Sequence, residues 1–199
     1  MTQWPLPDTT SDLQLLFRKR YRIENEIPDS GVHVGLLDGI KDGIKYRLSD
    51  EPEWKGKRFE DYVEELFDPQ YYSIVEKTHS YRQNEDRYVE SSMNPDFVFR
   101  YKRTGDLFAV ECKYRSGLNP KGMLEWSNPR QLERYRAFAK ERGTPVFIII
   151  GFKGFDDDPE DMFVIPLEAA KYPTLYPSVF NKYSRNPRKP FFWQRGALS

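Results

Sequence analysis

An uninterrupted apolar run, Val146-Phe147-Ile148-Ile149-Ile150, constrains the fold of this chain more than any other feature. Its length suits a strand, and a strand without polar side chains must be buried on both faces. The preceding residues have a helical pattern, so the chain reaches this strand through a helical crossover, which implies a parallel neighbour. We therefore expect an α/β sandwich in which helices flank both faces of a central sheet.

The helix before this strand has clear ends in the sequence. Asn128 is a good N-cap, Pro129 suits the first helical position, and Gly143 closes the far end. The buried stripe of this helix is expected to comprise Leu132, Tyr135, Phe138 and Ala139.

Two aromatic, β-branched strands are predicted at residues 94–101 and 106–113, joined by a Gly-bearing turn. Alternation places Glu111 and Lys113 on one face of the second strand and Cys112 on the other. Asp96 opens the first strand, and in a hairpin this open end lies beside the far end of the second strand. We therefore expect Asp96 to meet Glu111 and Lys113, in a sheet that mixes antiparallel and parallel pairs.

This polar group has a chemical interpretation. Two carboxylates held together raise each other's pKa unless a positive charge lies between them. Magnesium is a hard cation that takes carboxylate and backbone oxygens. A neighbouring lysine can orient a metal-bound water or stabilise charge that develops on a phosphate. Asp96, Glu111 and Lys113 therefore outline a site for cleaving phosphodiesters.

The sequence also resembles a known family. Pro95-Asp96, followed by Glu111-Cys112-Lys113, is similar to the motif of the PD-(D/E)XK nuclease superfamily. Gln131 and Tyr135, on the helix that follows, match the QxxxY motif of its exonuclease-like branch. The resemblance covers roughly residues 57–165 and implies a restriction-endonuclease-like sandwich, with a mixed central sheet flanked by helices.

The resemblance also implies roles for single residues. Asp96, Glu111 and the backbone carbonyl of Cys112 would bind Mg²⁺, with Mn²⁺ as a substitute. Lys113 would position the attacking water and offset charge on the phosphate. Gln131 would orient Lys113 or the scissile phosphate.

A helix is predicted from Lys57, with Glu60 and Glu64 one turn apart on the flank of its apolar face. In the resembled family the helix before the core strands often supplies a glutamate near the metal, and Glu60 matches it better. The alternative is that both glutamates are ordinary solvated acids.

Several polar and aromatic residues around the second helix are candidates for nucleic-acid contacts. These are Arg130 and Arg134 on the helix flank, Tyr135, and Trp126 in the preceding loop, which either stacks on a base or covers the core. Gln131 also occupies the position of a capping-box glutamine, and Tyr135 fits the buried stripe, so both have structural alternatives.

Composition limits the remaining possibilities. A net charge of zero argues against a nonspecific nucleic-acid coat protein, although basic groups occur at residues 18–22 and at Arg185, Arg188, Lys189 and Arg195. One cysteine excludes an internal disulfide, and no apolar run is long enough for a membrane span. We expect a cytoplasmic protein without membrane contact, DNA as its partner with RNA left open, and a homodimer as one possible assembly.

The expected domain organisation is a nuclease-like core at residues 57–166, an N-terminal extension at 1–56 that packs on it, and a C-terminal extension at 167–199. Asp156-Asp157-Asp158 is predicted to be a solvated turn. The leading functional hypothesis is a metal-dependent nuclease acting on DNA. The alternatives are an inactive nuclease-fold protein that binds nucleic acid or protein, and a plain surface pair of Glu111 and Lys113.

Overall fold

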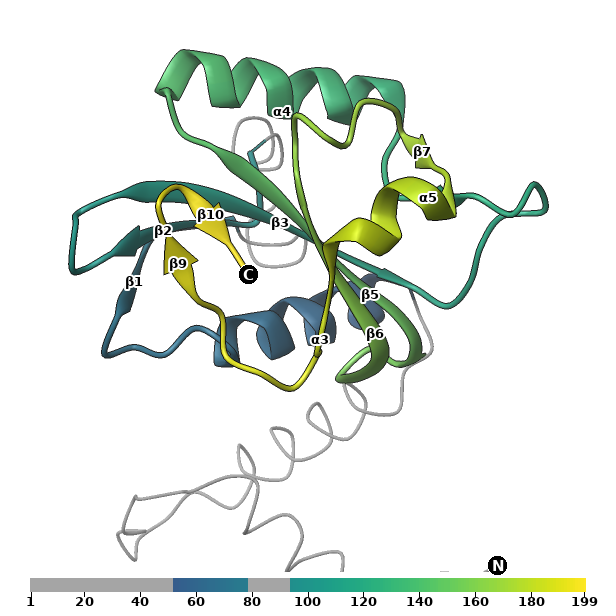
Figure 1. The fold of residues 1–199 in the computed structure, drawn as a ribbon, viewed down its shortest axis with the longest axis horizontal. Coiled ribbons are helices and arrows are strands. Elements are labelled where there is room, and N and C mark those ends of the chain that lie inside the picture. Colours follow the sequence, from purple (N-terminus) through teal and green to yellow (C-terminus); the bar gives the residue numbers. More distant parts are fainter. Residues whose placement is uncertain (1–51, 79–93) are drawn as a thin grey trace, which may run out of the picture. The chain divides into compact units, whose positions relative to one another are not determined.

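The computed structural model describes residues 52–78 and 94–199, which all belong to one unit, Tyr46–Ser199. Six strands form a single sheet (Figure 1). They are β1 (Tyr72–Lys77), β2 (Phe97–Tyr101), β3 (Leu107–Arg115), β5 (Val146–Phe155), β6 (Asp158–Pro166) and β8 (Ser184–Arg185). The basic run at 18–22 and most of the expected N-terminal extension lie outside the described residues.

The sheet is mixed, as predicted. Its strand order is β1-β2-β3-β5-β6-β8, and β3 and β5 are the parallel pair, while the other neighbours are antiparallel. The apolar run of β5 is buried throughout and lies between β3 and β6. The expected central strand with a parallel neighbour is therefore confirmed.

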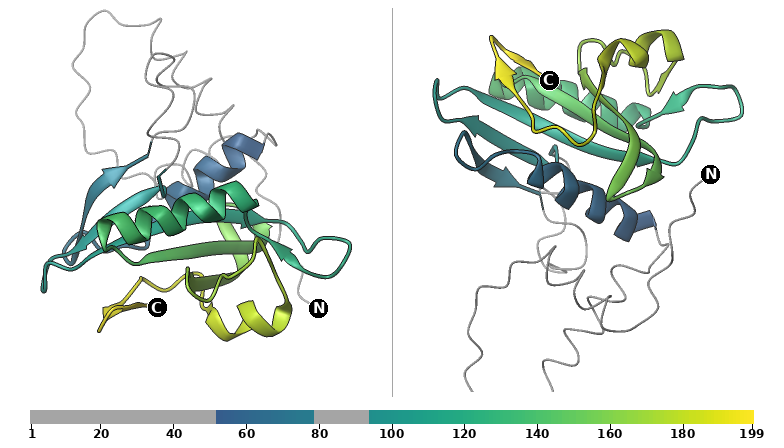
Figure 2. Two further views of the ribbon diagram at one scale, coloured as in Figure 1. Left: turned by 90° about the horizontal axis from the view of Figure 1, so that it is seen from above. Right: turned by 60° about the horizontal axis from the view of Figure 1, so that its bottom comes forward.

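Helices cover both faces of the sheet (Figure 2). Helix α3 (Pro52–Glu65) packs Phe59 and Val63 against the face that carries Phe108 and Val110. Helix α4 (Pro129–Arg142) packs its buried stripe on the opposite face, against Ala109 and other apolar side chains. The predicted alternation along β3 and the predicted fold class, an α/β sandwich with a mixed sheet between helices, are both confirmed.

The two ends of α4 follow the chemistry expected from the sequence. The Asn128 side chain accepts a hydrogen bond from the Gln131 N–H, and the Gln131 side chain accepts one from the Asn128 N–H, which completes a capping box. At the other end, Gly143 has φ 59°, a left-handed conformation that favours glycine. Because the cap fixes where the helix starts, it also fixes where Gln131 and Tyr135 lie over the sheet.

The β5–β6 hairpin corrects one prediction. A turn does lie at Asp156 and Asp157, but Asp156 is buried and both of its carboxylate oxygens accept hydrogen bonds from Arg58, at 2.8 and 2.7 Å. The prediction of a solvated turn was wrong for this residue because an arginine from α3 reaches it. The bidentate pair ties α3 to the end of the hairpin.

The C-terminal residues contribute to both faces. Two short ribbons pair β4 (Leu124–Glu125) with β7 (Thr174–Leu175) and β9 (Trp193–Gln194) with β10 (Ala197–Leu198), and a single turn of helix, α5 (Pro177–Phe180), follows β7. Trp193 stacks on Phe108 at 4.5 Å, in the cluster that also holds Phe59. The division at residue 167 stays a prediction. Within the described ranges, no helix is both long and apolar enough to cross a membrane.

Candidate active site

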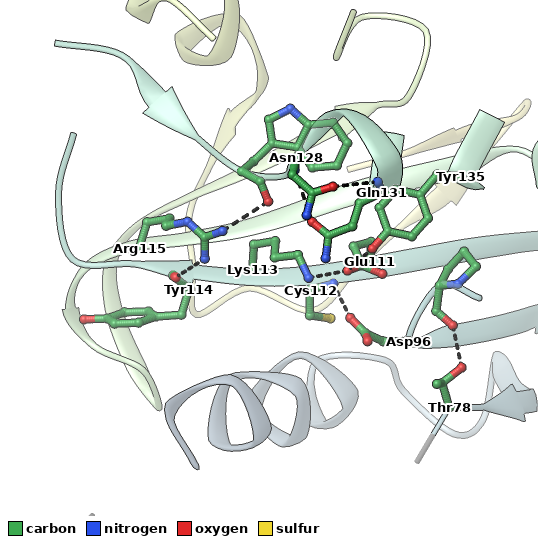
Figure 3. A network of polar contacts seen from close by, with 12 residues as sticks. Thr78, Asp96, Glu111, Cys112, Lys113, Tyr114, Arg115, Asn128, Gln131 and Tyr135 are labelled. Carbon is green, nitrogen blue, oxygen red and sulfur yellow. Dashed lines mark hydrogen bonds and ion pairs between the residues drawn. The ribbon is translucent and has the colours of Figure 1, made fainter. Parts of the chain in front are cut away.

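Glu111 and Asp96 lie next to each other where the β2–β3 ladder ends. The ladder's last pair joins Phe97 to Val110, so the following position places Asp96 beside Glu111. Asp96 Oδ2 accepts a hydrogen bond from the Cys112 N–H at 2.7 Å. Figure 3 shows Asp96, Glu111 and Lys113 gathered around this part of β3. The structure thus brings together the three side chains that the sequence predicted to meet.

Glu111 is a buried carboxylate, only 2% exposed beneath α4. Its Oε1 forms an ion pair with Lys113 and accepts a hydrogen bond from the Tyr135 hydroxyl at 2.5 Å. Its Oε2 is buried and has no hydrogen-bond partner among the described residues. Since Glu111 is covered, the interpretation of Glu111 and Lys113 as a surface pair is wrong.

Asp96 is held from two sides. Besides the bond from Cys112, the Thr78 N–H donates to the Asp96 carbonyl and the Thr78 hydroxyl to the Pro95 carbonyl, both at 2.9 Å. Burial and the nearby charge of Glu111 raise the pKa of Asp96 well above its usual range, although Lys113 opposes this. The sequence analysis did not identify Thr78, because its position at the end of β1 has no motif.

Lys113 is a cation in a largely buried place. Burial alone would lower its pKa, but the charges of Glu111 and Asp96 raise the pKa above its ordinary value. Lys113 therefore stays protonated over the whole physiological range. In this arrangement it can neutralise negative charge, and it is a poor proton acceptor.

Glu60 approaches the same group from α3. Burial raises its pKa to about 7, Lys57 opposes this, and the charge of Glu111 adds to it. Glu64, one turn further along, instead forms an ion pair with Lys77. Of the two glutamates considered from the sequence, Glu60 is thus the one whose charge interacts with the site.

Gln131 serves the helix start and also faces the site. Its side-chain oxygen accepts the Asn128 N–H at 3.2 Å, while Figure 3 shows its amide directed toward Lys113. Arg130 is exposed, and Arg134 is partly exposed, with a buried Nε that has no partner among the described residues. Both arginines lie on the first turns of α4, and their contact with a nucleic acid stays a prediction.

Tyr135 is buried and contacts Glu111 from α4. Its ring stacks on Trp126 at 6.1 Å, and burial, with the charge of Glu111, raises the pKa of its hydroxyl. Trp126 is fully buried and donates its indole N–H to the Tyr172 carbonyl at 2.8 Å, so it covers the core. Tyr135 therefore supports the carboxylate, a contact that its helical spacing alone did not reveal.

Arg115 is a second residue that sequence analysis missed. It follows Glu111 and Lys113 on β3, yet its guanidinium donates to the backbone carbonyls of Tyr114, Glu125 and Trp126. These bonds hold together the two ends of the loop at residues 116–123. An arginine two positions after the site lysine suggests phosphate binding, but here its donors hold the chain segment that carries Trp126.

The residues present fit a divalent cation. Within 52–78 and 94–199, no three His, Cys, Asp or Glu side chains form a ready metal cluster. Mg²⁺, however, is usually held by one or two carboxylates and keeps several waters. Asp96 and Glu111 Oε2 are two such donors, and the Cys112 carbonyl points to the same edge of β3 as its N–H. A buried carboxylate oxygen without a partner costs free energy, which a cation would offset.

The fold has counterparts among solved structures. The structure is similar to that of Hjc. This Holliday junction resolvase comes from the archaeal hyperthermophile Archaeoglobus fulgidus; the TM-score is 0.45 and the sequence identity 19%, over 64% of this chain and 93% of that chain. No protein-family model matches the chain, and no curated protein does. The chemistry of the site is accordingly argued from its own residues.

Proposed function

We propose that this protein is a Mg²⁺-dependent nuclease that hydrolyses phosphodiester bonds, most readily in DNA. The observation that carries this proposal is Glu111, a buried carboxylate with one oxygen bound by Lys113 and Tyr135 and the other left without a partner. A second carboxylate, Asp96, lies beside it with a raised pKa. Two acids and a lysine held in this way suit a divalent cation and a substrate that gains negative charge in the transition state.

Each residue has a part in this proposal. Asp96, Glu111 and the Cys112 carbonyl would hold the ion, which when bound polarises the phosphoryl oxygen and makes water a better nucleophile. Lys113 neutralises charge on the phosphate, in keeping with its raised pKa. Glu60 would hold a metal-bound water or a second ion. Of the two roles expected for Gln131, orienting Lys113 or the scissile phosphate, the phosphate is favoured, because the Gln131 oxygen accepts the Asn128 N–H and its amide nitrogen can only donate. Mn²⁺ should replace Mg²⁺, since it takes the same oxygen ligands.

The test begins with metal binding. Mg²⁺ and Mn²⁺ are titrated calorimetrically into wild type, Asp96→Ala and Glu111→Gln, and the same samples are then incubated with linear and with circular DNA. We expect binding and cleavage in wild type and the loss of both in the two variants. Glu64→Gln is the matched control, because Glu64 lies on α3 but pairs with Lys77.

The outcomes separate the alternatives. Metal binding without cleavage of any DNA would favour the inactive binding protein. Wild type that binds no divalent ion would refute the proposed site. Circular dichroism of each variant establishes that a loss of activity is not a loss of folding.

A further inference from the structure

Two aromatic side chains are exposed beside the start of α4. Tyr172 and Tyr176 are 70% and 63% exposed, and they flank β7. In Figure 1, β7 and α5 lie near the end of α4 at which the helix begins. This segment lies on the same side of the sheet as Tyr135, because Leu175 and Phe180 pack in the cluster that contains Tyr135.

The backbone that carries these rings is firmly held. The carbonyls of Lys171, Tyr172 and Pro173 each accept a hydrogen bond from α4 or from the segment just before it, at 2.8 to 3.0 Å. Tyr176 is the N-cap of α5, and its carbonyl accepts the Val179 N–H at 2.8 Å. These bonds hold the backbone of this segment in place beside α4, and both rings attached to it are exposed.

The backbone of Tyr172 is connected to the candidate site by direct contacts. The Tyr172 carbonyl accepts the Trp126 indole N–H, the Trp126 ring stacks on Tyr135, and the Tyr135 hydroxyl donates to Glu111. Four residues thus span the distance from the surface to the carboxylate. The segment that carries Tyr172 is thus joined to the residues that support Glu111.

The charges around the rings favour an anionic ligand. Lys171 precedes Tyr172 and is exposed, and Arg136, which donates to the Lys171 carbonyl, is also exposed. Glu125, which pairs with Thr174 in the β4–β7 ribbon, is an acidic side chain in the same region. Aromatic rings interleaved with cations are typical of proteins that bind unpaired nucleotides, because bases stack on the rings while cations contact the phosphates.

We propose that Tyr172 and Tyr176 form a binding site for the unpaired bases of a single-stranded DNA segment, next to the nuclease site. The choice of DNA as occupant rests on the proposed function. Paired bases are stacked within a duplex and do not offer their faces to the two rings, so the site prefers single strands, frayed ends or branched DNA.

The test measures binding without cleavage. Full-length protein in EDTA is titrated into a fluorescein-labelled oligothymidylate and into a duplex of the same length, and anisotropy reports the affinity. Because stacking on an aromatic ring contributes about 1–3 kcal/mol per base, Tyr172→Ala and Tyr176→Ala should each weaken single-strand binding by about 5- to 150-fold. Tyr172→Phe and Tyr176→Phe keep the ring and should bind as wild type does.

Phe192→Ala is the matched control. Phe192 is also an exposed aromatic residue, at 57%, but its neighbour Trp193 donates to Asp106, at the opposite end of β3 from the site. This variant should bind the single strand with wild-type affinity. Thermal unfolding of all variants should be unchanged, because the substituted rings are exposed.

Three results would overturn the proposal. In the first, wild type does not bind the single strand. In the second, the tyrosine-to-alanine variants bind it as tightly as Phe192→Ala does. In the third, these variants lose single-strand and duplex affinity equally. Because EDTA removes the metal, the result is independent of cleavage. Tyrosine-dependent single-strand binding by a protein that cuts no DNA would retain this site and remove only the proposed nuclease activity.

Discussion

Glu111 gains its support from a residue that lies 24 positions away. The Tyr135 hydroxyl and Lys113 share one carboxylate oxygen, and this leaves the other oxygen free. Groups that hydrogen-bond to a metal-ligating side chain fix its orientation and its basicity. At the residue scale, Tyr135 is thus a positioning residue for Glu111.

Removing the Tyr135 hydroxyl tests this role. Tyr135→Phe keeps the ring on Trp126 but leaves Glu111 Oε1 with only Lys113, so we expect Mg²⁺ affinity or cleavage to fall about 10- to 100-fold. Calorimetry and a cleavage assay measure the two quantities. Wild-type values for both would show that the hydroxyl only satisfies the core.

The raised pKa of Glu60 predicts how stability depends on pH. Between its ordinary value of 4.5 and about 7, folded Glu60 holds a proton that the unfolded chain has lost, so the folded state binds more protons. The free energy of unfolding of the metal-free protein should therefore decrease as pH rises through this range.

Denaturant unfolding in EDTA, at a series of pH values, measures this slope. Glu60→Gln removes one titrating group and should reduce the slope, while the raised pKa of Asp96 retains part of it; Glu64→Gln should keep the wild-type slope. An identical slope in wild type and Glu60→Gln would contradict the assigned burial.

At the scale of elements, the first turn of α4 has two tasks. Its capping box stabilises the helix, and the same Gln131 directs its amide toward Lys113. The sequence allowed both interpretations of Gln131, and the structure accommodates them together. Helix stability and site geometry are therefore coupled through one side chain.

Two substitutions separate these tasks. Asn128→Ala and Gln131→Ala both break the capping box, and the cap loss should lower the free energy of unfolding by about 0.5–2 kcal/mol. Gln131→Ala should in addition lower cleavage per folded molecule, while Gln131→Glu should keep the stability, since glutamate also completes a capping box. Equal activity in the two alanine variants would assign Gln131 to the cap alone.

Local rules account for what could be predicted from the sequence. The capping residues correctly predicted the ends of α4, and the alternation of side chains correctly predicted which residues of β3 share a face. Both features depend on neighbours within a few residues. Contacts between distant positions were beyond such rules: Tyr135 with Glu111, and Arg58 with Asp156 across 98 positions.

Strand length was also underestimated. The apolar run predicted a strand at 146–150, whereas β5 extends to Phe155 and its hairpin partner β6 begins at Asp158. The outer part of this hairpin exposes Lys153, Gly154 and Phe155, so it lacks the apolar pattern that marked the buried part. The β5–β6 hydrogen bonds continue into this exposed part of the hairpin, where the sequence has no apolar pattern that would predict a strand.

At the scale of the whole described unit, the C-terminal residues complete the core. Trp193 stacks on Phe108, and Phe191 stacks on Phe67 at 4.4 Å, so the final ribbon closes the face that α3 covers in part. Phe191 and Trp193 are buried, while Phe192 between them is exposed. The last residues are thus part of the structure that holds the site.

Trp193→Ala should destabilise the protein without changing the site. Loss of a buried tryptophan typically costs about 3–5 kcal/mol, whereas Phe192→Ala should change stability by less than about 0.5 kcal/mol. Thermal and denaturant unfolding measure both, and Mg²⁺ affinity below the transition should match wild type. Equal stability of the two variants would contradict the packing described.

The three carbonyl bonds of Arg115 have a consequence for engineering and for evolutionary change. They pin both ends of the loop at residues 116–123, so its length is not fixed by the site that it adjoins. Lengthening a closed loop costs little, about 0.6 kcal/mol for each doubling. Foreign segments can therefore be grafted between these ends, and a lineage can exchange this loop for another while the strand that carries Glu111 keeps its place.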